Sequence, residues 1–238
     1  MPRIIGILGG MGPLATADLY QKIIRATPAT CDQDHLHVII DANPAVPDRT
    51  AFLRGLGPDP LPLLTAGVRR LVQADAAFIA IPCNTAHAFL PALRERSGIP
   101  ILDMVAETAA RVRADHPQAR RVGILATTGT LDFGLYHAAL RAEGLEPLQP
   151  DPDDQEQLVT AAIAAVKAGN TAPAIGALLA EAGRRLALAG AEVLLAACTE
   201  IPLVLTPAMV SLPLLDPTQV LAEAAVREAT SSVSGGMR

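Results

Sequence analysis

Residues 77–85 read Ala-Phe-Ile-Ala-Ile-Pro-Cys-Asn-Thr, and residues 193–200 read Val-Leu-Leu-Ala-Ala-Cys-Thr-Glu. Each stretch is an apolar run that ends at a cysteine, and Cys83 and Cys198 lie 115 residues apart. A short apolar run bounded by polar residues is typical of a buried strand. The chain therefore carries the same strand-and-turn unit twice, with a thiol at the same point of each.

Two further segments repeat in the same order and at nearly the same offset. Residues 3–8 resemble residues 121–125, and residues 99–103 resemble residues 212–216. Such a repeat predicts two similar halves related by a pseudo-twofold axis. An axis of this kind can set two like residues on opposite sides of one cleft.

Alternation of strands and helices indicates an α/β fold in which mainly parallel sheets are flanked by helices on both faces. The expected strands cover residues 3–8, 35–40, 77–81, 121–125 and 192–197. The expected helices cover residues 13–25, 61–73, 84–96, 103–115, 131–143, 155–168, 173–189 and 216–230. Residues 41–60 are rich in Pro, Gly and Asp and are expected to form a long loop.

The repeat divides the chain into an N-terminal half, residues 1–117 with Cys83, and a C-terminal half, residues 118–215 with Cys198. The closing helix at 216–230 is a candidate to pack on the first half. Residues 231–238 are expected to form a disordered tail. Ligands of parallel sheets bind beyond the carboxyl ends of the strands, so the active site is expected in the cleft between the halves.

Composition narrows the class of protein. The formal net charge of −5 argues against nucleic acid as a partner. No apolar run approaches the about 20 residues of a membrane helix, and no signal peptide precedes the first strand. Three cysteines, an odd number, fit a reducing compartment better than a disulfide framework. We therefore expect a cytoplasmic protein without a membrane partner.

Both repeated cysteines are followed by residues that favour the start of a helix, Asn84-Thr85 and Thr199. A thiol at a helix N-terminus is stabilised as thiolate. Two facing thiols suit a reaction that removes a proton from one face of a carbon and returns it to the other face. The plain alternative is a pair of buried structural cysteines. Cys31 has no counterpart in the second half and is taken as incidental.

Two competing motifs are weaker. Gly10-x-Gly12-x-x-Ala15 after a strand, with Asp41 ending the next strand, matches a dinucleotide fingerprint. The equivalent turn at residues 126–130 is rich in threonine, so we favour a site for a carboxylate.

Cys83 and His87 could form a hydrolase pair or half of a metal site, but the second half has Pro202 in place of the histidine. We expect His87 to pack or cap near the cleft.

Two basic residues are candidates to recognise an acidic substrate. Arg49 lies in the long proline-rich loop. Lys167 ends a helix, with Gly169 placed to terminate it, although a lysine at a helix C-terminus also suits the helix dipole.

At these positions the chain resembles the aspartate/glutamate racemase superfamily, and within it the cofactor-independent aspartate racemases. The similar segments span nearly the whole chain and are residues 6–16, 43–50, 82–87, 125–130, 166–170 and 197–200. The resemblance implies two α/β domains, a homodimer, and catalysis without pyridoxal phosphate or any other cofactor or metal. It assigns catalysis to Cys83 and Cys198, with Cys83 acting on the D-enantiomer and Cys198 on the L-enantiomer.

The resemblance also implies a set of substrate-binding residues. Arg49 and Lys167 match the two basic residues associated with aspartate. Asn84, Thr85, Thr127 and Thr199 match positions near the α-carboxylate and amino group. Met11 and Glu200 are further candidates for substrate binding.

The leading hypothesis is therefore a racemase of aspartate that uses two cysteines as its bases. Within enzymes, the alternatives are racemisation of glutamate or of a broader range of amino acids, or isomerisation of a small diacid. From another class, the alternative is a binding protein for acidic amino acids.

Overall fold

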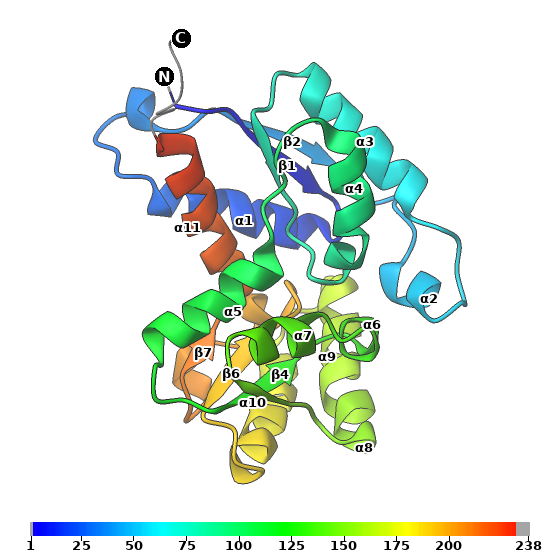
Figure 1. Ribbon diagram of the computed structural model, residues 1–238. Coiled ribbons are helices and arrows are strands. Elements are labelled where there is room, and N and C mark those ends of the chain that lie inside the picture. Colours follow the sequence, from blue (N-terminus) through cyan, green and yellow to red (C-terminus); the bar gives the residue numbers. More distant parts are fainter. Residues whose placement is uncertain (1, 232–238) are drawn as a thin grey trace.

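The computed structural model describes residues 2–231 and contains two parallel β-sheets, one in each half of the repeat (Figure 1). The first sheet has the strand order β2-β1-β3, and the second has the order β5-β4-β6-β7. The strands are β1 (Ile5–Gly9), β2 (Val38–Ala42), β3 (Phe78–Ala80), β4 (Arg121–Leu125), β5 (Glu146–Leu148), β6 (Val193–Ala196) and β7 (Leu214–Leu215). The predicted α/β class is confirmed.

Strand pairing repeats between the two sheets. The central strand β1 pairs with β2 and β3, as β4 pairs with β5 and β6. The third repeated segment lies beside β3 in the first sheet and beside β6 in the second. In the first sheet an isolated parallel bridge joins Ile79 to Ile101. In the second sheet β7 pairs with β6, with Leu194 opposite Leu214. The internal repeat of the sequence is thus a repeat of strand order.

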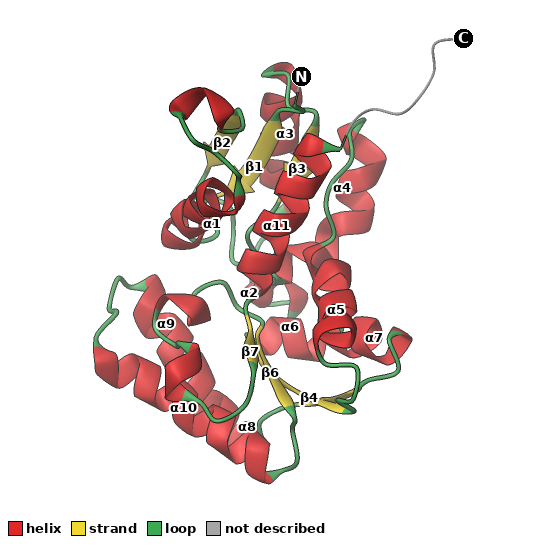
Figure 2. Ribbon diagram, turned by 90° about the vertical axis from the view of Figure 1, so that its left-hand side faces the viewer, coloured by secondary structure: helices red, strands yellow, loops and turns green. Residues whose placement is uncertain are grey.

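Helices cover both faces of each sheet (Figure 2). They are α1 (Pro13–Ala26), α2 (Arg49–Leu53), α3 (Leu61–Gln73), α4 (Leu90–Ser97), α5 (Met104–Asp115), α6 (Thr128–Asp132), α7 (Leu135–Ala142), α8 (Pro152–Asp154), α9 (Ala161–Lys167), α10 (Pro173–Leu188) and α11 (Pro217–Thr230). A π-helical segment, Gln155–Thr160, joins α8 to α9. Pro13 opens α1 at its first position, as predicted.

The helix that follows each sheet in the sequence packs on the other sheet: α5 follows the first sheet and packs on the second, and α11 follows the second and packs on the first. The side chains of Asp103 and Asp216 cap α5 and α11 at equivalent points of the repeat. Helix α5 contributes apolar residues to the core of the second sheet, whereas α11 contributes to the core of the first sheet around β1. We therefore propose a boundary between the halves near Asp103 rather than residue 117, with α11 joined to the first half.

Three expectations about local structure were wrong. The loop at 41–60 contains α2, because the side chain of Asp48 accepts a hydrogen bond from the amide of Ala51 and starts a helical turn. The helix expected at 131–143 is broken at Gly134, whose φ of 71° is left-handed. The helix expected at 84–96 begins as a 3₁₀ helix, Thr85–Phe89, before α4.

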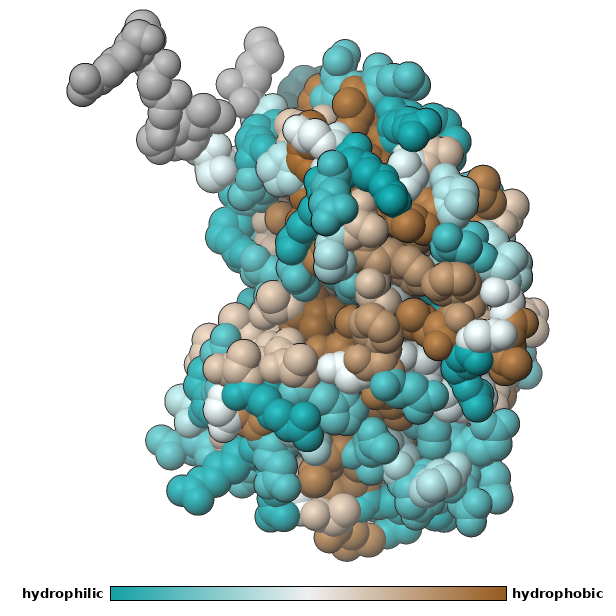
Figure 3. All heavy atoms as spheres, turned by 45° about the vertical axis from the view of Figure 1, so that its right-hand side comes forward, coloured by the Kyte–Doolittle hydropathy of each residue, from teal (hydrophilic) through white to brown (hydrophobic). Residues whose placement is uncertain are grey.

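Figure 3 shows a waist between the two halves, with apolar surface gathered along it. No helix within residues 2–231 has the length and apolar character needed to span a membrane. The tail expected at 231–238 lies, apart from Ser231, outside the described residues.

Candidate active site

The two repeated cysteines meet at one inner pocket between the halves. Cys83 follows β3 and Cys198 follows β6, so each thiol lies just beyond the carboxyl end of a parallel strand. Both are buried, with 5% and 6% of their surface exposed. The free volume of the inner pocket is about 10 Å³, close to the space that one water needs. In this conformation the two thiols thus share a nearly closed space.

Every predicted site residue lines this inner pocket. Besides the two thiols, its wall contains Met11, Arg49, Asn84, Thr85, Thr127, Lys167, Thr199 and Glu200. Asp48 and Thr50 also line it, and the sequence did not single them out. The first half and the second half both contribute, so the site exists only where the two halves meet.

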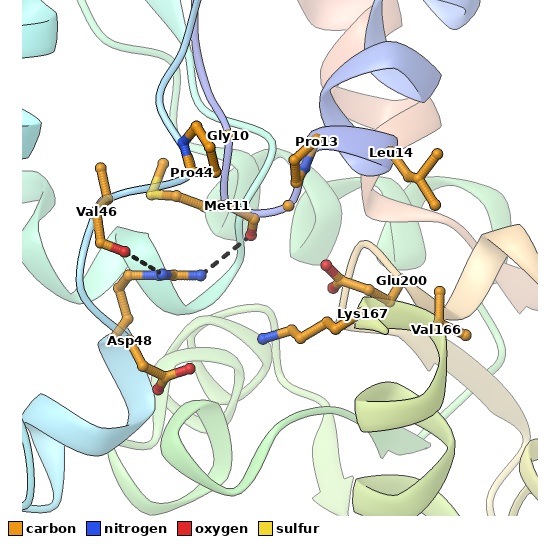
Figure 4. Close-up of a pocket in the computed structure, with 12 residues that line it drawn as sticks. Gly10, Met11, Pro13, Leu14, Pro44, Val46, Asp48, Val166, Lys167 and Glu200 are labelled. Atoms are coloured by element: carbon orange, nitrogen blue, oxygen red, sulfur yellow. Dashed lines mark hydrogen bonds between the residues drawn. The ribbon is translucent and has the colours of Figure 1, made fainter. Parts of the chain in front are cut away.

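A larger outer pocket of about 290 Å³ shares part of its wall with the inner one, and Figure 4 shows the residues that line this outer pocket. Five residues line both pockets and so stand between them: Met11, Asp48, Arg49, Lys167 and Glu200. The outer wall combines these charged side chains with apolar residues, which are Met11, Pro13, Leu14, Pro44, Val46 and Val166.

Arg49 is held by the backbone around it. Its guanidinium donates to the carbonyl oxygens of Val46 and Pro47 and, at 3.3 Å, to that of Met11. Among the described residues its Nε has no hydrogen-bond partner, although the side chain is 8% exposed. Burial opposes the charge of Arg49, but the adjacent Cys83 raises its pKa above the ordinary value. The cation is therefore fixed beside Cys83 with a donor still available.

Lys167 reaches the pocket from the end of α9 in the second half (Figure 4). Gly169, with a φ of 85°, follows the helix in the left-handed conformation, as predicted. Burial alone would lower the pKa of Lys167, but Cys198, Glu200 and Cys83 raise it above the usual range. Lys167 therefore stays charged beside Glu200 and the two cysteines.

Asn84 is positioned by Tyr136, a residue that the sequence did not single out. The hydroxyl of Tyr136 on α7 donates to Oδ1 of Asn84 at 2.6 Å, across the boundary between the halves. Tyr136 is fully buried, and burial raises its pKa, so the hydroxyl stays protonated. Nδ2 of Asn84, also buried, has no partner among the described residues. The amide donor is thus oriented and unpaired at the inner pocket.

Tyr136→Phe is expected to loosen this arrangement. The ring keeps its packing, but a buried acceptor loses its donor, which costs about 1–3 kcal/mol of unfolding free energy. With Asn84 no longer oriented, we expect KM to rise about tenfold, equivalent to about 1.4 kcal/mol of binding, with a smaller change in kcat. Steady-state kinetics and thermal denaturation measure both effects. Tyr20→Phe, at the other tyrosine, is the matched control, and equal KM changes in both variants would contradict the role of Tyr136.

Beside Asn84, hydrogen bonds among three threonine hydroxyls connect the first half to the second half. The Oγ1 atoms of Thr85, Thr127 and Thr130 lie 2.9–3.0 Å from one another. Each can donate one hydrogen bond and accept another within this triangle. Thr130 was not predicted, because nothing in its sequence context shows that it reaches the other half.

The predicted capping roles near the cysteines were wrong. Asn84 precedes the 3₁₀ helix after Cys83, but its side chain bonds to Tyr136 instead of capping. The residue before the short helix Ile201–Leu203 is Glu200, not Thr199, and its side chain does not cap either. Glu200 instead accepts a hydrogen bond from the thiol of Cys198, with 3.0 Å between Sγ and Oε2.

His87 links the backbone of Cys83 to α5. Its Nε2 accepts a hydrogen bond from the amide of Met104 at 3.2 Å, so its Nδ1 carries the hydrogen and donates to the carbonyl of Cys83 at 2.9 Å. Both ring nitrogens are used, which leaves none for a metal or a substrate. Burial lowers the pKa of His87, so the ring is neutral. The expectation that His87 packs near the cleft is confirmed.

This neutral histidine predicts a loss of stability in mild acid. The folded pKa lies below the unfolded value of about 6.5, so the unfolded state binds more protons as the pH falls through 6.5. The free energy of unfolding should therefore be fully retained above pH 6.5 and decrease below it. Urea denaturation at a series of pH values should show a shallower decrease in His87→Gln. The exposed His37→Gln controls for the loss of a histidine, and an unchanged slope in His87→Gln would contradict this account.

The glycine-rich turn is closed to a dinucleotide. A side chain at Gly10 would meet the backbone of Asn43 at 2.4 Å, and the amide of Gly10 already donates to Thr16. The carboxylate of Asp41, the candidate ribose ligand, is bound by Arg70 through both oxygens. Within residues 2–231, no three His, Cys, Asp or Glu side chains are grouped as a metal site.

Known proteins resemble this chain in sequence and in structure. The family model described as Asp/Glu/hydantoin racemase matches residues 8–225. The broad-specificity amino-acid racemase RacX of Bacillus subtilis is 30% identical over 94% of this chain and 96% of its own. The aspartate racemase of Picrophilus torridus has a similar structure, with a TM-score of 0.84 and 28% identity over 95% of this chain and 94% of its own.

A more distant structure shares the fold alone. The glutamate racemase of Francisella tularensis has a TM-score of 0.68 and 16% identity, and the match covers 94% of this chain and 79% of that one.

Proposed function

The chain belongs to the Asp/Glu/hydantoin racemase family, and from that premise we propose that it interconverts L- and D-aspartate with Cys83 and Cys198 as its two bases. Family membership makes it an amino-acid racemase, and an amino acid its substrate. The observation that carries the proposed mechanism is the meeting of two buried thiols, from equivalent strands, in one pocket.

The proposed reaction moves two protons. A thiolate on one side removes the α-proton, and the thiol on the other side donates its proton to the opposite face of the carbon. Positioned proton transfer contributes about 10²–10⁴-fold. The α-proton is far less acidic than a thiol, so donors that stabilise the carbanionic state must supply much of the remaining acceleration.

The unpaired donors of the pocket suit the substrate's carboxylates. Nδ2 of Asn84 and Nε of Arg49 are buried without partners among the described residues, and a carboxylate can satisfy both. A second carboxylate in a closed site needs positive charge nearby, which Arg49 and Lys167 provide from the two halves. The substrate's ammonium needs an anion, and Glu200 is a buried carboxylate in the same wall.

A broader substrate range is the second candidate. The likeness to RacX, whose name states broad specificity, covers nearly the whole chain. The outer pocket, whose wall contains both apolar and charged side chains, also has room for side chains longer than that of aspartate. The homodimer and the cytoplasmic location remain predictions, and light scattering of the purified protein would test the first.

Solvent deuterium incorporation at the α-carbon tests the proposed function. We expect each enantiomer of aspartate, incubated with the enzyme in D₂O, to yield the deuterated opposite enantiomer by NMR and chiral chromatography. A panel that adds glutamate, alanine and lysine separates the two candidates. Faster exchange of several neutral or basic amino acids than of aspartate would replace the aspartate assignment with the broader one.

A further inference from the structure

The internal repeat places different residues two positions after each cysteine. In the first half this position is Thr85, and in the second half it is Glu200. The surroundings of the two thiols are therefore equivalent in backbone but unequal in charge.

The contacts differ accordingly. Oε2 of Glu200 accepts a hydrogen bond from the thiol of Cys198 at 3.0 Å, and the hydroxyl of Thr199 lies 3.4 Å from the same oxygen. Oε1 faces Gly12, where an added side chain would approach it to 3.2 Å, so the carboxylate is confined. The hydroxyl of Thr85 is instead occupied by Thr127 and Thr130.

Cys83 has the opposite environment. Within residues 2–231 no carboxylate forms a hydrogen bond with its thiol, and the cation of Arg49 lies beside it. One thiol thus has an acceptor for its proton, and the other has a neighbouring positive charge.

We propose that Glu200 makes the two thiols unequal: its carboxylate holds the proton on Cys198 in the resting enzyme and leaves the thiolate to Cys83 beside Arg49. This inference rests on the proposed two-cysteine racemase. It makes Glu200 a residue that sets the starting protonation state of the reaction.

The physical basis is that a carboxylate accepts a hydrogen bond from a thiol but repels a thiolate. Burial raises the pKa of Cys198, and Glu200 raises it further, whereas Lys167 acts in the opposite direction. The ionisable groups that face Glu200 are Cys198, Lys167 and Arg49, so the carboxylate lies beside two cations as well as the thiol.

The consequence for turnover is that the resting enzyme is ready for proton removal by Cys83 and not for proton removal by Cys198. In the resting form, the Cα–H bond breaks toward the thiolate of Cys83 and the S–H bond of Cys198 breaks toward the opposite face of Cα. The product form carries a thiol at Cys83 and a thiolate at Cys198 next to Glu200. Repulsion from Glu200 raises the free energy of that form and favours return of a proton to Cys198.

The pH dependence of alkylation at each cysteine tests this inference without relying on activity. Iodoacetamide modification of the full-length protein is followed by mass spectrometry of the peptides that contain Cys83 and Cys198. In the wild type we expect the midpoint for Cys198 to lie above that for Cys83. In Glu200→Gln we expect the midpoint for Cys198 to fall by about one pH unit, a tenfold gain in thiolate, with a smaller change at Cys83.

The exposed Glu156→Gln is the matched control and should reproduce the wild-type midpoints. A wild-type midpoint for Cys198 at or below that for Cys83 would overturn the inference, as would an unchanged midpoint in folded Glu200→Gln. If Glu200→Gln does not fold, as judged by circular dichroism, the wild-type order alone decides. Because the readout is thiol ionisation, the result is distinct from a failure of deuterium incorporation, which would overturn the proposed function instead.

Discussion

Alanine in place of Cys83 or Cys198 is expected to lower kcat/KM for racemisation by about 10²–10⁴-fold in both directions, the range for losing a positioned proton-transfer group. Each direction needs one thiol to remove a proton and the other to supply one, so neither can be spared. The equilibrium constant of a racemisation is one, and kcat/KM must therefore fall equally for the two enantiomers. Polarimetry started from pure L- and pure D-aspartate measures both values.

Cys31→Ala is the matched control, because Cys31 is the exposed third cysteine and lies outside the pocket. Each active-site variant keeps one base, so we expect residual α-proton exchange with solvent for one enantiomer without inversion. If Cys83 acts on the D-enantiomer, Cys198→Ala should exchange D-aspartate and Cys83→Ala should exchange L-aspartate. Racemisation retained at near wild-type rate in either variant would contradict the two-base mechanism.

The sequence was informative where a local pattern was repeated. Apolar runs that end at Cys83 and Cys198 predicted the strands β3 and β6, and the carboxyl ends of parallel strands predicted a shared cleft. The short strands β5 and β7 were missed because two or three residues, one of them Pro147, carry no detectable alternation.

Long-range partners could not be predicted, because amphipathic patterns show which face of a helix is buried but not against which sheet. This is why the exchange of α5 and α11 between the halves appears only in the structure. The same limit hid Tyr136, whose hydroxyl meets Asn84 across the two halves. Glu200 was noted as a neighbour of Cys198, but its hydrogen bond to the thiol depends on the turn after β6.

The proposed specificity for aspartate rests on Arg49 and Lys167, which come from different halves and line the same two pockets. Their charges repel each other, since Arg49 lowers the pKa of Lys167 even though Cys198, Glu200 and Cys83 raise it overall. An anion of the substrate beside both cations would offset this repulsion. The side-chain carboxylate of aspartate would fill that role, and alanine has no such group.

Arg49→Ala should therefore cost about 2–5 kcal/mol of transition-state binding for aspartate, the range for removing one partner of a buried charge pair. Because every 1.4 kcal/mol is tenfold, kcat/KM should fall at least about 25-fold. Part of the loss is structural, since the carbonyls of Val46, Pro47 and Met11 lose their donor. That part applies to every substrate, so the informative quantity is the ratio of kcat/KM for aspartate to that for alanine.

Three variants separate charge from structure. Lys167→Met removes the second cation but keeps the length of the side chain, and it should lower the aspartate-to-alanine ratio without affecting the carbonyls around Arg49. Arg49→Lys keeps the charge, so the ratio should fall less than in Arg49→Ala. Arg54→Ala, at an exposed arginine outside both pockets, is the control and should leave the ratio unchanged. Equal proportional losses for aspartate and alanine in Arg49→Ala and Lys167→Met would show that neither cation recognises the side chain, and the broader substrate range would then replace aspartate.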